Sequence, residues 1–417
     1  MIRIYEENQE FGQYTKYDTN KGILTHISLD EFSVLKKTNE VYSGVNSPIH
    51  TNFPRRIYFQ ITRNCNLRCD YCFIKAEPNN NHLSKSVILK SAEYFGNKGL
   101  MEVRLTGGEP TTHPDFKEIH EKFRKENIYV SLATNCIWSA DMMDYLSNQD
   151  DLWIIASIDG NKDIHNKYRH NSYDAVLRNL FTLRQLNKNI RLRLNTVLTK
   201  ENVVDIEHLA KLTRDLGAES ITLIPLRPQV RDLSVREKML TSEDFKTVLE
   251  KMIYYKSLYN ISFTTTIETK YKDLIMKDKI FEKKSSCAAG REGTNLDFDN
   301  ENQKFVLYAC SYCPASDLSE KRNIREPFLA GEYPFNDLEK FTEIWNDNER
   351  WELFRNLSLK SDDCKICDEL GKRCTGSCPI QNINLTGVAE NDDIKEELMR
   401  QMRKNAEWYC YKFIDKT

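Results

Sequence analysis

Residues 56–72 have the sequence Arg56-Ile-Tyr-Phe-Gln-Ile-Thr62-Arg-Asn-Cys65-Asn-Leu-Arg-Cys69-Asp-Tyr-Cys72, a strand-like run that leads directly into a loop with three cysteines. The cysteines are spaced as CxxxCxxC. Three thiolates on one tight loop can hold three irons of a 4Fe–4S cluster and leave the fourth iron without a protein ligand. The alternative is a structural zinc site, although zinc knuckles usually supply CxxC pairs. An iron with an open position can bind and reduce a ligand, so the loop predicts redox chemistry.

Strand and helix patterns alternate six times between residue 56 and about residue 226. The expected strands are short and rich in β-branched and aromatic residues: Ile57–Thr62, Val103–Thr106, Tyr129–Ala133, Leu152–Ser157, Arg191–Val197 and Ile221–Pro225. Helical periodicity fills the gaps, as in residues 206–216, where Gly217 is placed to end the helix. Such alternation predicts a parallel sheet with right-handed crossovers. Because six units fall short of the eight in a full barrel, we expect an α/β fold with a partial (β/α)6 TIM-like barrel.

The composition indicates a globular, soluble protein. Of 417 residues, 40% are hydrophobic and 29% charged, and the net charge of −2 gives no global attraction to nucleic acid or anionic membranes. No apolar signal segment and no run of eighteen apolar residues is found, which predicts a cytoplasmic protein without a membrane span. Twelve cysteines are too many for disulfides in a reducing cytoplasm. Their clustering in two regions instead predicts metal ligation.

Four regions are expected along the chain: an N-terminal appendage and linker at 1–54, the barrel at 55–235, a connecting segment at 236–285, and a small Cys-rich domain at 286–417. The appendage combines a hairpin-like stretch at 17–22 with Ser28-Leu-Asp-Glu31, a capping-box pattern at the start of a short helix. The tail has few long apolar runs, which is typical of a small domain stabilised by metal clusters.

A second motif, Gly107-Gly108-Glu109-Pro110, follows the second expected strand. Two glycines let backbone groups approach a ligand closely, and a carboxylate beside them can bind an ammonium group. A Gly-Gly turn after a strand is by itself more often only a turn. Its position one β/α unit after the cysteine loop favours a shared site at the carboxyl ends of the strands.

Together these motifs resemble the radical S-adenosylmethionine (SAM) family over roughly residues 55–230. The matching residues are Cys65, Cys69 and Cys72 with Tyr71, then Gly107 to Pro110, Thr134-Asn135, Ser157-Ile-Asp159-Gly160 and Asn195-Thr-Val197. The resemblance implies a cluster whose open iron chelates the amino and carboxylate groups of SAM. It also implies reductive cleavage of SAM to methionine and a 5′-deoxyadenosyl radical, which removes a hydrogen atom from a substrate.

The resemblance further implies which residues bind the cofactor: Tyr71, Gly107, Gly108, Glu109, Thr134, Ser157, Asp159, Arg169 and Asn195. Glu109 and the two glycines would receive the methionine ammonium group, and Tyr71 would stack on the adenine ring. Arg169 follows His165 by four residues and is a candidate partner for the SAM carboxylate, with a surface salt bridge as the alternative. His165 is expected to order the loop. Cys136 departs from the family, which usually has Gly after Thr-Asn.

The tail resembles the SPASM auxiliary-cluster domain, with a generic zinc domain as the alternative. The resemblance assigns Cys287, Cys310 and Cys378 to a nearer 4Fe–4S cluster and Cys364, Cys367, Cys374 and Cys410 to a farther one. Cys313 is either the fourth ligand of the nearer cluster or free. The implied cofactors are therefore SAM and three 4Fe–4S clusters.

SPASM radical enzymes are best known for modifying ribosomally made peptides by crosslinking, epimerisation or oxidation, so a peptide is the expected substrate. The alternative is a small molecule, such as a sugar, cyclitol or nucleoside, that is oxidised or epimerised. Sulfatase maturases share an Asp where this chain has Ser311, which argues against that activity. Electrons would come from a low-potential flavodoxin or ferredoxin. The sequence leaves open the bond that is changed, the general acid or base, and the oligomeric state.

Overall fold

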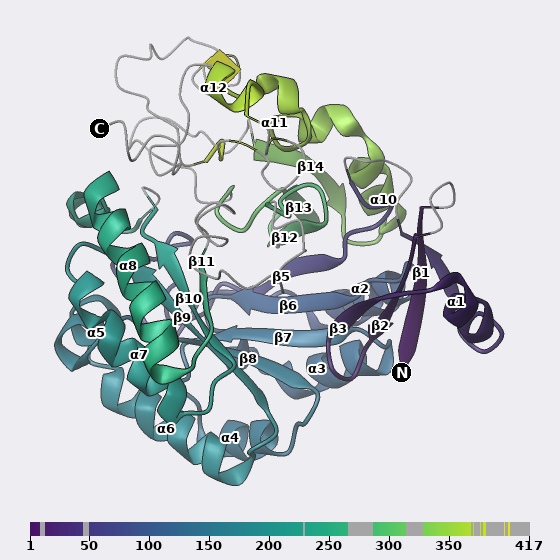
Figure 1. Ribbon diagram of the computed structural model, residues 1–417. Helices are drawn as coiled ribbons and strands as arrows, with labels where there is room; N and C mark the ends of the chain where they lie inside the picture. Colours follow the sequence, from purple (N-terminus) through teal and green to yellow (C-terminus); the bar gives the residue numbers. More distant parts are fainter. Residues whose placement is uncertain are drawn as a thin grey trace.

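The computed structural model describes most of the chain (Figure 1). The described residues are 1–8, 13–44, 50–227, 230–265, 287–313, 328–367, 370, 376, 378–380, 396 and 399–400. They form one sheet of four strands and one of ten, in the order β11-β10-β9-β8-β7-β6-β5-β12-β13-β14. No helix in these residues is long and apolar enough to cross a membrane.

The six expected parallel strands are all present and are neighbours in chain order: β5 (Arg56–Thr62), β6 (Glu102–Gly107), β7 (Tyr129–Thr134), β8 (Leu152–Ser157), β9 (Arg191–Leu198) and β10 (Ser220–Pro225). Each pairs in parallel with the next. The predicted partial (β/α)6 barrel is therefore confirmed.

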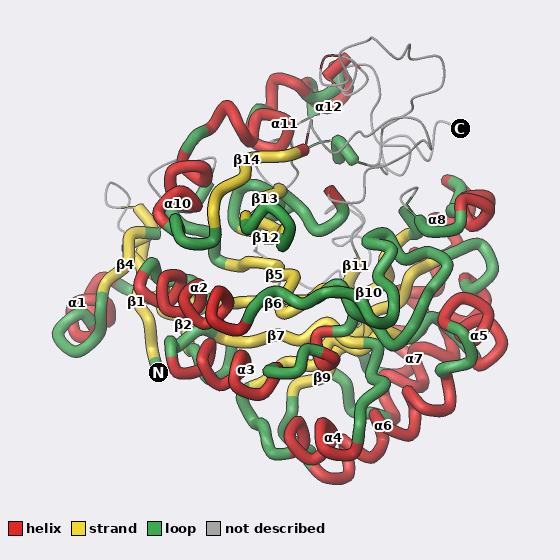
Figure 2. The backbone as a smooth tube through the Cα atoms, turned by 180° about the vertical axis from the view of Figure 1, so that it is seen from behind, coloured by secondary structure: helices red, strands yellow, loops and turns green. Residues whose placement is uncertain are grey.

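Helices cover the outer face of these strands (Figure 2). They are α2 (Lys85–Asn97), α3 (Phe116–Lys125), α4 (Ala140–Ser147), α5 (Lys162–Arg169), α6 (Tyr173–Leu186), α7 (Ile206–Asp215) and α8 (Ser242–Tyr259). The apolar side chains that alternate along each strand pack beneath them. Phe59 of β5, for example, contacts Phe95 of α2 and Phe123 of α3, with ring centroids 6.2 and 6.3 Å apart. Gly217 ends α7 with a φ of 56°, as predicted.

Strands from later in the chain extend both edges of the barrel sheet. β11 (Phe263–Thr265) pairs in parallel with β10, and β12 (Gly293–Asp299) pairs in parallel with β5. β13 (Lys304–Tyr308) and β14 (Leu329–Pro334) continue the sheet in antiparallel fashion. The described part of the Cys-rich region thus begins inside the barrel sheet, and its expected boundary at 285/286 stays a prediction.

Short helices complete the described structure. In the Cys-rich region these are α10 (Glu339–Asn346), α11 (Glu352–Arg355) and α12 (Asp362–Lys365). Short 3-10 segments lie at Pro110–Thr112, Val203–Asp205, Leu233–Lys238, Asn348–Trp351 and Leu357–Leu359. Trp345 and Trp351 are almost fully buried and pack edge to face, which anchors α10 and the turn after it.

The N-terminal unit packs against the amino-terminal end of the barrel. It contains β1 (Ile2–Asn8), β2 (Gln13–Asp18), β3 (Ile23–Ile27), α1 (Leu29–Leu35) and β4 (Val41–Ser43), with the sheet order β3-β2-β1-β4. The expected cap is present, because Ser28 accepts a hydrogen bond from the backbone N–H of Glu31. Tyr17 packs with Tyr129, at the start of β7, so this unit covers the barrel end opposite the predicted site.

Candidate functional site

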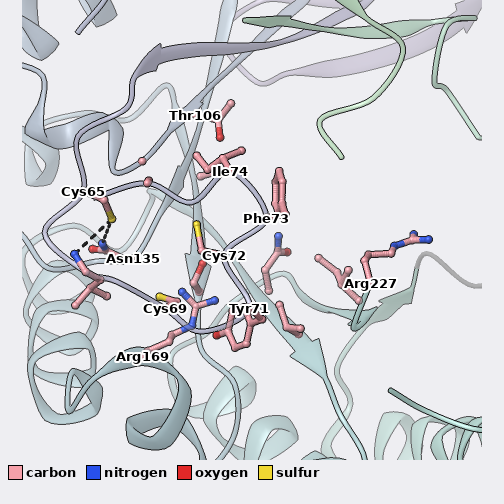
Figure 3. A pocket seen from close by; sticks show the side chains of 18 of the residues that line it. Cys65, Cys69, Tyr71, Cys72, Phe73, Ile74, Thr106, Asn135, Arg169 and Arg227 are labelled. Atoms are coloured by element: carbon pink, nitrogen blue, oxygen red, sulfur yellow. Dashed lines mark hydrogen bonds between the residues drawn. The ribbon is translucent and has the colours of Figure 1, made fainter. Parts of the chain in front are cut away.

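A cavity of about 240 Å³ lies at the carboxyl ends of the barrel strands (Figure 3). The three loop cysteines line it together with seven of the nine predicted cofactor-binding residues: Tyr71, Gly107, Gly108, Thr134, Ser157, Arg169 and Asn195. Glu109 and Asp159 do not line the cavity; they are 1% and 0% exposed and lie behind it. The predicted residues are thus brought together, but in two layers.

The cysteine loop is held by its own backbone and by its neighbours. The Cys65 N–H donates to the carbonyl of Glu77 at 3.1 Å, and the Cys72 N–H donates to the carbonyl of Cys69 at 3.2 Å. Burial raises the pKa of Cys65 to about 12 and that of Cys69 to about 11. Metal ligation requires deprotonated thiols, and iron would supply the positive charge that stabilises them. Three thiols on the wall of one cavity fit a 4Fe–4S cluster with one iron open.

Gly107 and Gly108 are required because β6 ends against the start of the cysteine loop. A Cβ atom on Gly107 would lie 2.2 Å from the carbonyl oxygen of Thr62, and one on Gly108 would lie 2.1 Å from that of Asn64. Gly107 also has a φ of 145°. The two glycines therefore let the backbone of β6 lie close to the cysteine loop, and not only close to a ligand in the cavity.

Glu109 connects the ends of β6 and β7. Its carboxylate accepts hydrogen bonds from the Thr111 hydroxyl at 2.7 Å, the Thr134 hydroxyl at 2.9 Å and the Asn135 N–H at 2.7 Å. Burial raises the pKa of this carboxyl, and these hydrogen bonds oppose the rise. The position makes Glu109 an anchor for Thr134 and Asn135, and its expected contact with the SAM ammonium group stays a prediction.

Asp159 fixes the residues on the opposite wall of the cavity. Its buried carboxylate accepts hydrogen bonds from the Tyr71 hydroxyl, from Nε of Arg169, and from the Val197 N–H at 2.8 Å. The Arg169 guanidinium keeps the pKa of Asp159 below its usual value despite burial. Figure 3 shows the Arg169 side chain beside Cys69 and Tyr71. The salt bridge that was the alternative for Arg169 is present, with Asp159, but it is buried, because Arg169 is only 9% exposed.

His165 holds the turn after β8. It is fully buried, its Nδ1 accepts from the Asp159 N–H at 3.3 Å, and its Nε2 lies 2.9 Å from the Ser172 hydroxyl. Burial lowers the pKa of His165 to about 4, so the ring is neutral near pH 7. This placement agrees with the expectation that His165 orders the loop.

Two residues that sequence reasoning missed form the wall between the cavity and the Cys-rich region. Tyr312 packs against Phe73 at 4.7 Å between ring centroids, and the Arg227 guanidinium lies 5.1 Å from the Tyr312 ring centroid. All three line the cavity. Arg227 follows the last barrel strand and Tyr312 lies inside Cys310-Ser-Tyr-Cys313. In the sequence, only these positions could have indicated that Arg227 and Tyr312 line the cavity.

Part of the expected nearer cluster site is brought together. The Cys313 N–H donates to the Cys310 carbonyl at 3.0 Å. Burial and the neighbouring Cys310 raise the pKa of the Cys313 thiol, and Cys378 is close enough to add to the rise. Cys287 is exposed. Of the farther set, Cys364 and Cys367 share one turn, in which the Cys367 N–H donates to the Cys364 carbonyl at 3.0 Å. The remaining two, Cys374 and Cys410, lie outside the described residues.

The sequence of this chain is similar to that of known SAM-dependent proteins. Residues 59–213 match the family model of the radical SAM superfamily. The AdoMet-dependent heme synthase of Methanosarcina barkeri is 25% identical over 363 residues, which cover 83% of this chain and 96% of the relative. The PqqA peptide cyclase of Gluconobacter oxydans is 23% identical over 344 residues, which cover 82% and 89% of the two chains.

Solved structures agree with the fold. Streptococcus suis SuiB bound to S-adenosylmethionine superposes with a TM-score of 0.67 at 14% identity, over 94% of this chain and 96% of SuiB. SuiB bound to its precursor peptide SuiA superposes with a TM-score of 0.64 at 14% identity, over 88% and 93%. At this identity the similarity shows a shared fold.

Proposed function

From the radical SAM domain at residues 59–213, we infer that this chain cleaves SAM reductively and modifies a ribosomally made peptide by crosslinking, epimerisation or oxidation. The observation that carries the SAM part is the cavity at the strand ends, which the loop cysteines share with Gly107, Gly108 and Arg169. The peptide part is supported by two similar proteins: a peptide cyclase, and an enzyme whose structure was solved with a precursor peptide.

A 4Fe–4S cluster held by Cys65, Cys69 and Cys72 would supply the electron that cleaves SAM to methionine and a 5′-deoxyadenosyl radical. On the opposite wall, Arg169 carries a positive charge beside Cys69, where it suits the SAM carboxylate. The ion pair with Asp159 fixes its orientation.

The other cavity residues suit the nucleoside part of SAM. Ser157 and Asn195 offer a hydroxyl and an amide at adjacent strand ends, and Oδ1 of Asn195 is buried without a hydrogen-bond partner among the described residues. A ribose hydroxyl would satisfy that oxygen. Tyr71 presents a ring held in place by its hydroxyl, which suits stacking on adenine.

We propose two auxiliary clusters in the Cys-rich region. The grouping of Cys310, Cys313 and Cys378 supports the nearer one, with Cys313 as a ligand because it is fully buried beside Cys310. Tyr312, which lies between Cys310 and Cys313 in the sequence, lines the cavity, so a cluster held by these cysteines would be close to it. A flavodoxin or ferredoxin would deliver the electrons, and a reducing cytoplasm would protect an exposed cluster.

The alternative substrate is a small molecule. The specific observation in its favour is the similarity to the heme synthase of Methanosarcina barkeri, which extends over 83% of this chain. In this case the same SAM site would act on a non-peptide substrate.

The test is to reconstitute the enzyme without oxygen, reduce it, and supply SAM with the peptides encoded beside its gene. We expect 5′-deoxyadenosine to form, and its rate to rise with one peptide whose mass changes. If 5′-deoxyadenosine forms but no peptide changes mass, the small-molecule alternative replaces the peptide. If no 5′-deoxyadenosine forms, the SAM assignment is wrong.

A further inference from the structure

The charged side chains on the wall of the cavity lie in two separate places. Among the described residues that line it, leaving the cysteines aside, Arg169 and Arg227 are charged and none is acidic. Arg169 is paired with Asp159 behind the wall and suits the SAM carboxylate. Arg227 lies on the side of the cavity away from the three cysteines (Figure 3). The proposed SAM site does not use this side, which leaves it for a group of the substrate.

The end of β10 and an aromatic pair hold Arg227 in place. The Leu226 N–H donates to the Leu198 carbonyl at 2.8 Å, which fixes the backbone one residue before Arg227. The Arg227 guanidinium lies 5.1 Å from the Tyr312 ring centroid, and the Tyr312 ring packs on Phe73 at 4.7 Å. Phe73 directly follows the cysteine loop, and Tyr312 belongs to the Cys-rich region. Arg227 therefore lies where these two parts of the chain meet at the cavity.

The surroundings of Arg227 favour binding of an anion. Phe73, Leu226 and Tyr312 give this side of the cavity an apolar wall. In such an environment a charge-assisted hydrogen bond is electrostatically stronger than in water. Arg227 and Tyr312 are half-buried and both line the cavity, so a ligand inside it can contact them. A guanidinium that stacks on a ring keeps in-plane N–H groups that match the geometry of a carboxylate.

A group on the other side of Arg227 also favours a cation. Hydrogen bonding with Cys313 lowers the pKa of Cys310 to about 7, and the Arg227 guanidinium adds to this effect. Cys310 does not line the cavity, whereas Arg227 does. The positive charge of Arg227 thus acts on both the cavity and the Cys-rich region, and a test has to separate these two roles.

We propose that Arg227 is a specificity-determining residue that binds a carboxylate of the substrate, while Phe73 and Tyr312 pack against the apolar part of the same substrate group. The substrate class is then a peptide whose carboxylate, on an acidic side chain or at a free C-terminus, lies beside the residue that reacts. A carboxylate bound there borders both the proposed SAM site and the proposed nearer cluster. This inference rests on the proposed function and names its substrate more narrowly.

The experiment measures binding of small probes by isothermal titration calorimetry, using reconstituted enzyme with SAM and no reductant. One pair of probes is N-acetyl-L-glutamate N-methylamide and its glutamine counterpart, and the other is N-acetyl-L-leucine and N-acetyl-L-leucinamide. We expect the carboxylate in at least one pair to bind at least about tenfold more tightly than its neutral counterpart. A preference in the glutamate pair identifies an acidic side chain, and one in the leucine pair identifies a C-terminus. No preference in either pair overturns the proposal.

Arg227→Met is expected to abolish the preference for the carboxylate, and Arg227→Lys to keep part of it. Arg214→Met is the matched control, because the Arg214 guanidinium also lies over a tyrosine ring, 5.2 Å from the centroid of Tyr259, but does not line the cavity. This control should keep the full preference. If the preference persists in Arg227→Met, or is lost equally in Arg214→Met, the assignment is wrong.

Two further measurements on Arg227→Met separate the substrate from the other negative groups. The iron content and the SAM affinity of this variant should equal those of the wild type. A loss of iron would assign the charge to Cys310, and SAM binding weakened by about tenfold would assign it to the SAM carboxylate. Either result overturns the proposal.

Substitution of Tyr312 tests the aromatic surface beside Arg227. Tyr312→Phe should keep the carboxylate preference because the ring face remains, and Tyr312→Leu should reduce it because the guanidinium loses that face. Equal effects of the two substitutions overturn the role of the ring. Since no reductant is present, failure of these tests leaves the proposed function standing. The proposed function fails separately, through absent 5′-deoxyadenosine or an unchanged peptide mass.

Discussion

Arg169 donates from Nε to the fully buried carboxylate of Asp159, ten residues earlier in the chain. The same carboxylate accepts the hydroxyl of Tyr71, so one buried anion orients a cation and an aromatic ring that both line the cavity. Neither donor would keep its orientation without Asp159. The residue thus acts by positioning other side chains.

Asp159→Asn should weaken SAM binding and destabilise the fold. Removing one partner of a buried ion pair leaves Arg169 uncompensated, and we expect the free energy of unfolding to fall by about 3 kcal/mol. SAM affinity should fall roughly tenfold or more, since a charge-assisted hydrogen bond contributes about 1.5–3 kcal/mol. Denaturation and equilibrium binding measure the two effects. Asp174→Asn, at an exposed pair with Lys162, is the control and should change neither by much. Unchanged SAM affinity in Asp159→Asn would contradict the positioning role.

Gly108→Ala should displace the cysteine loop. The added Cβ would lie 2.1 Å from the Asn64 carbonyl oxygen, a backbone atom that cannot rotate away. We expect a loss of about 3 kcal/mol or more of stability, together with a lower iron content. Gly217→Ala is the matched control, because no atom lies within 4 Å of its added Cβ and only its φ of 56° is unfavourable. It should lower the free energy of unfolding by about 1 kcal/mol and leave the iron content unchanged. Equal effects of the two substitutions would refute the steric explanation.

Glu109→Gln should lower the free energy of unfolding by about 1–3 kcal/mol, because an amide nitrogen would then face backbone or hydroxyl donors. Glu118→Gln, at an exposed pair with Lys85, is the control with an effect close to zero. Urea denaturation and SAM binding should be measured together. A loss of SAM affinity with unchanged stability would show that Glu109 acts on SAM directly.

Acid should destabilise the chain below about pH 6.5, in part through two buried histidines. Burial lowers the pKa of both His120 and His165 to about 4. Because the unfolded state binds protons at higher pH than the folded state, this stability is fully present above about pH 6.5. It is lost as the pH falls toward 4, by about 1.4 kcal/mol per pH unit for each histidine. Denaturation at pH 7 and pH 5 should therefore differ by roughly 2 kcal/mol per histidine.

His120→Phe should remove the part of this pH dependence that comes from His120, roughly 2 kcal/mol between pH 7 and pH 5, although it also loses the contact between Nδ1 and the Tyr145 hydroxyl at 2.8 Å. His26→Gln, at an exposed position, should leave the slope unchanged. If the slope between pH 7 and pH 5 is the same in His120→Phe as in the wild type, the buried histidine is not its source.

The reconstituted enzyme should contain about twelve iron atoms per chain, as three 4Fe–4S clusters require. Combined replacement of Cys65, Cys69 and Cys72 by Ala should reduce this to about eight and abolish 5′-deoxyadenosine formation. Cys136→Gly is the control, because Cys136 is buried off the cavity with a φ of 63° that glycine adopts easily; its iron content should stay unchanged. An iron count near eight in the wild type would remove one auxiliary cluster from the proposal.

Much of the fold and the membership of the site could be predicted from the sequence because both depend on local patterns. Alternating apolar residues place each barrel strand, and the residue that follows a parallel strand must lie at the shared carboxyl edge. The loop cysteines, Gly107 and Ser157 are therefore brought together by strand order alone. The fully buried position of Cys136 depends on packing and was not predictable from spacing.

Only the tertiary structure decided which polar groups satisfy one another. The pairs of Glu109 with Asn135 and of Asp159 with Arg169 join segments whose separation in sequence carries no periodic signal. Asn295 reaches the inner face of the barrel because β12 adds to β5, more than 230 residues earlier in the chain. The cysteine spacing thus determined that a cluster loop exists. Long-range hydrogen bonding and charge compensation decided what surrounds it, because they depend on distances in space that a linear pattern does not contain.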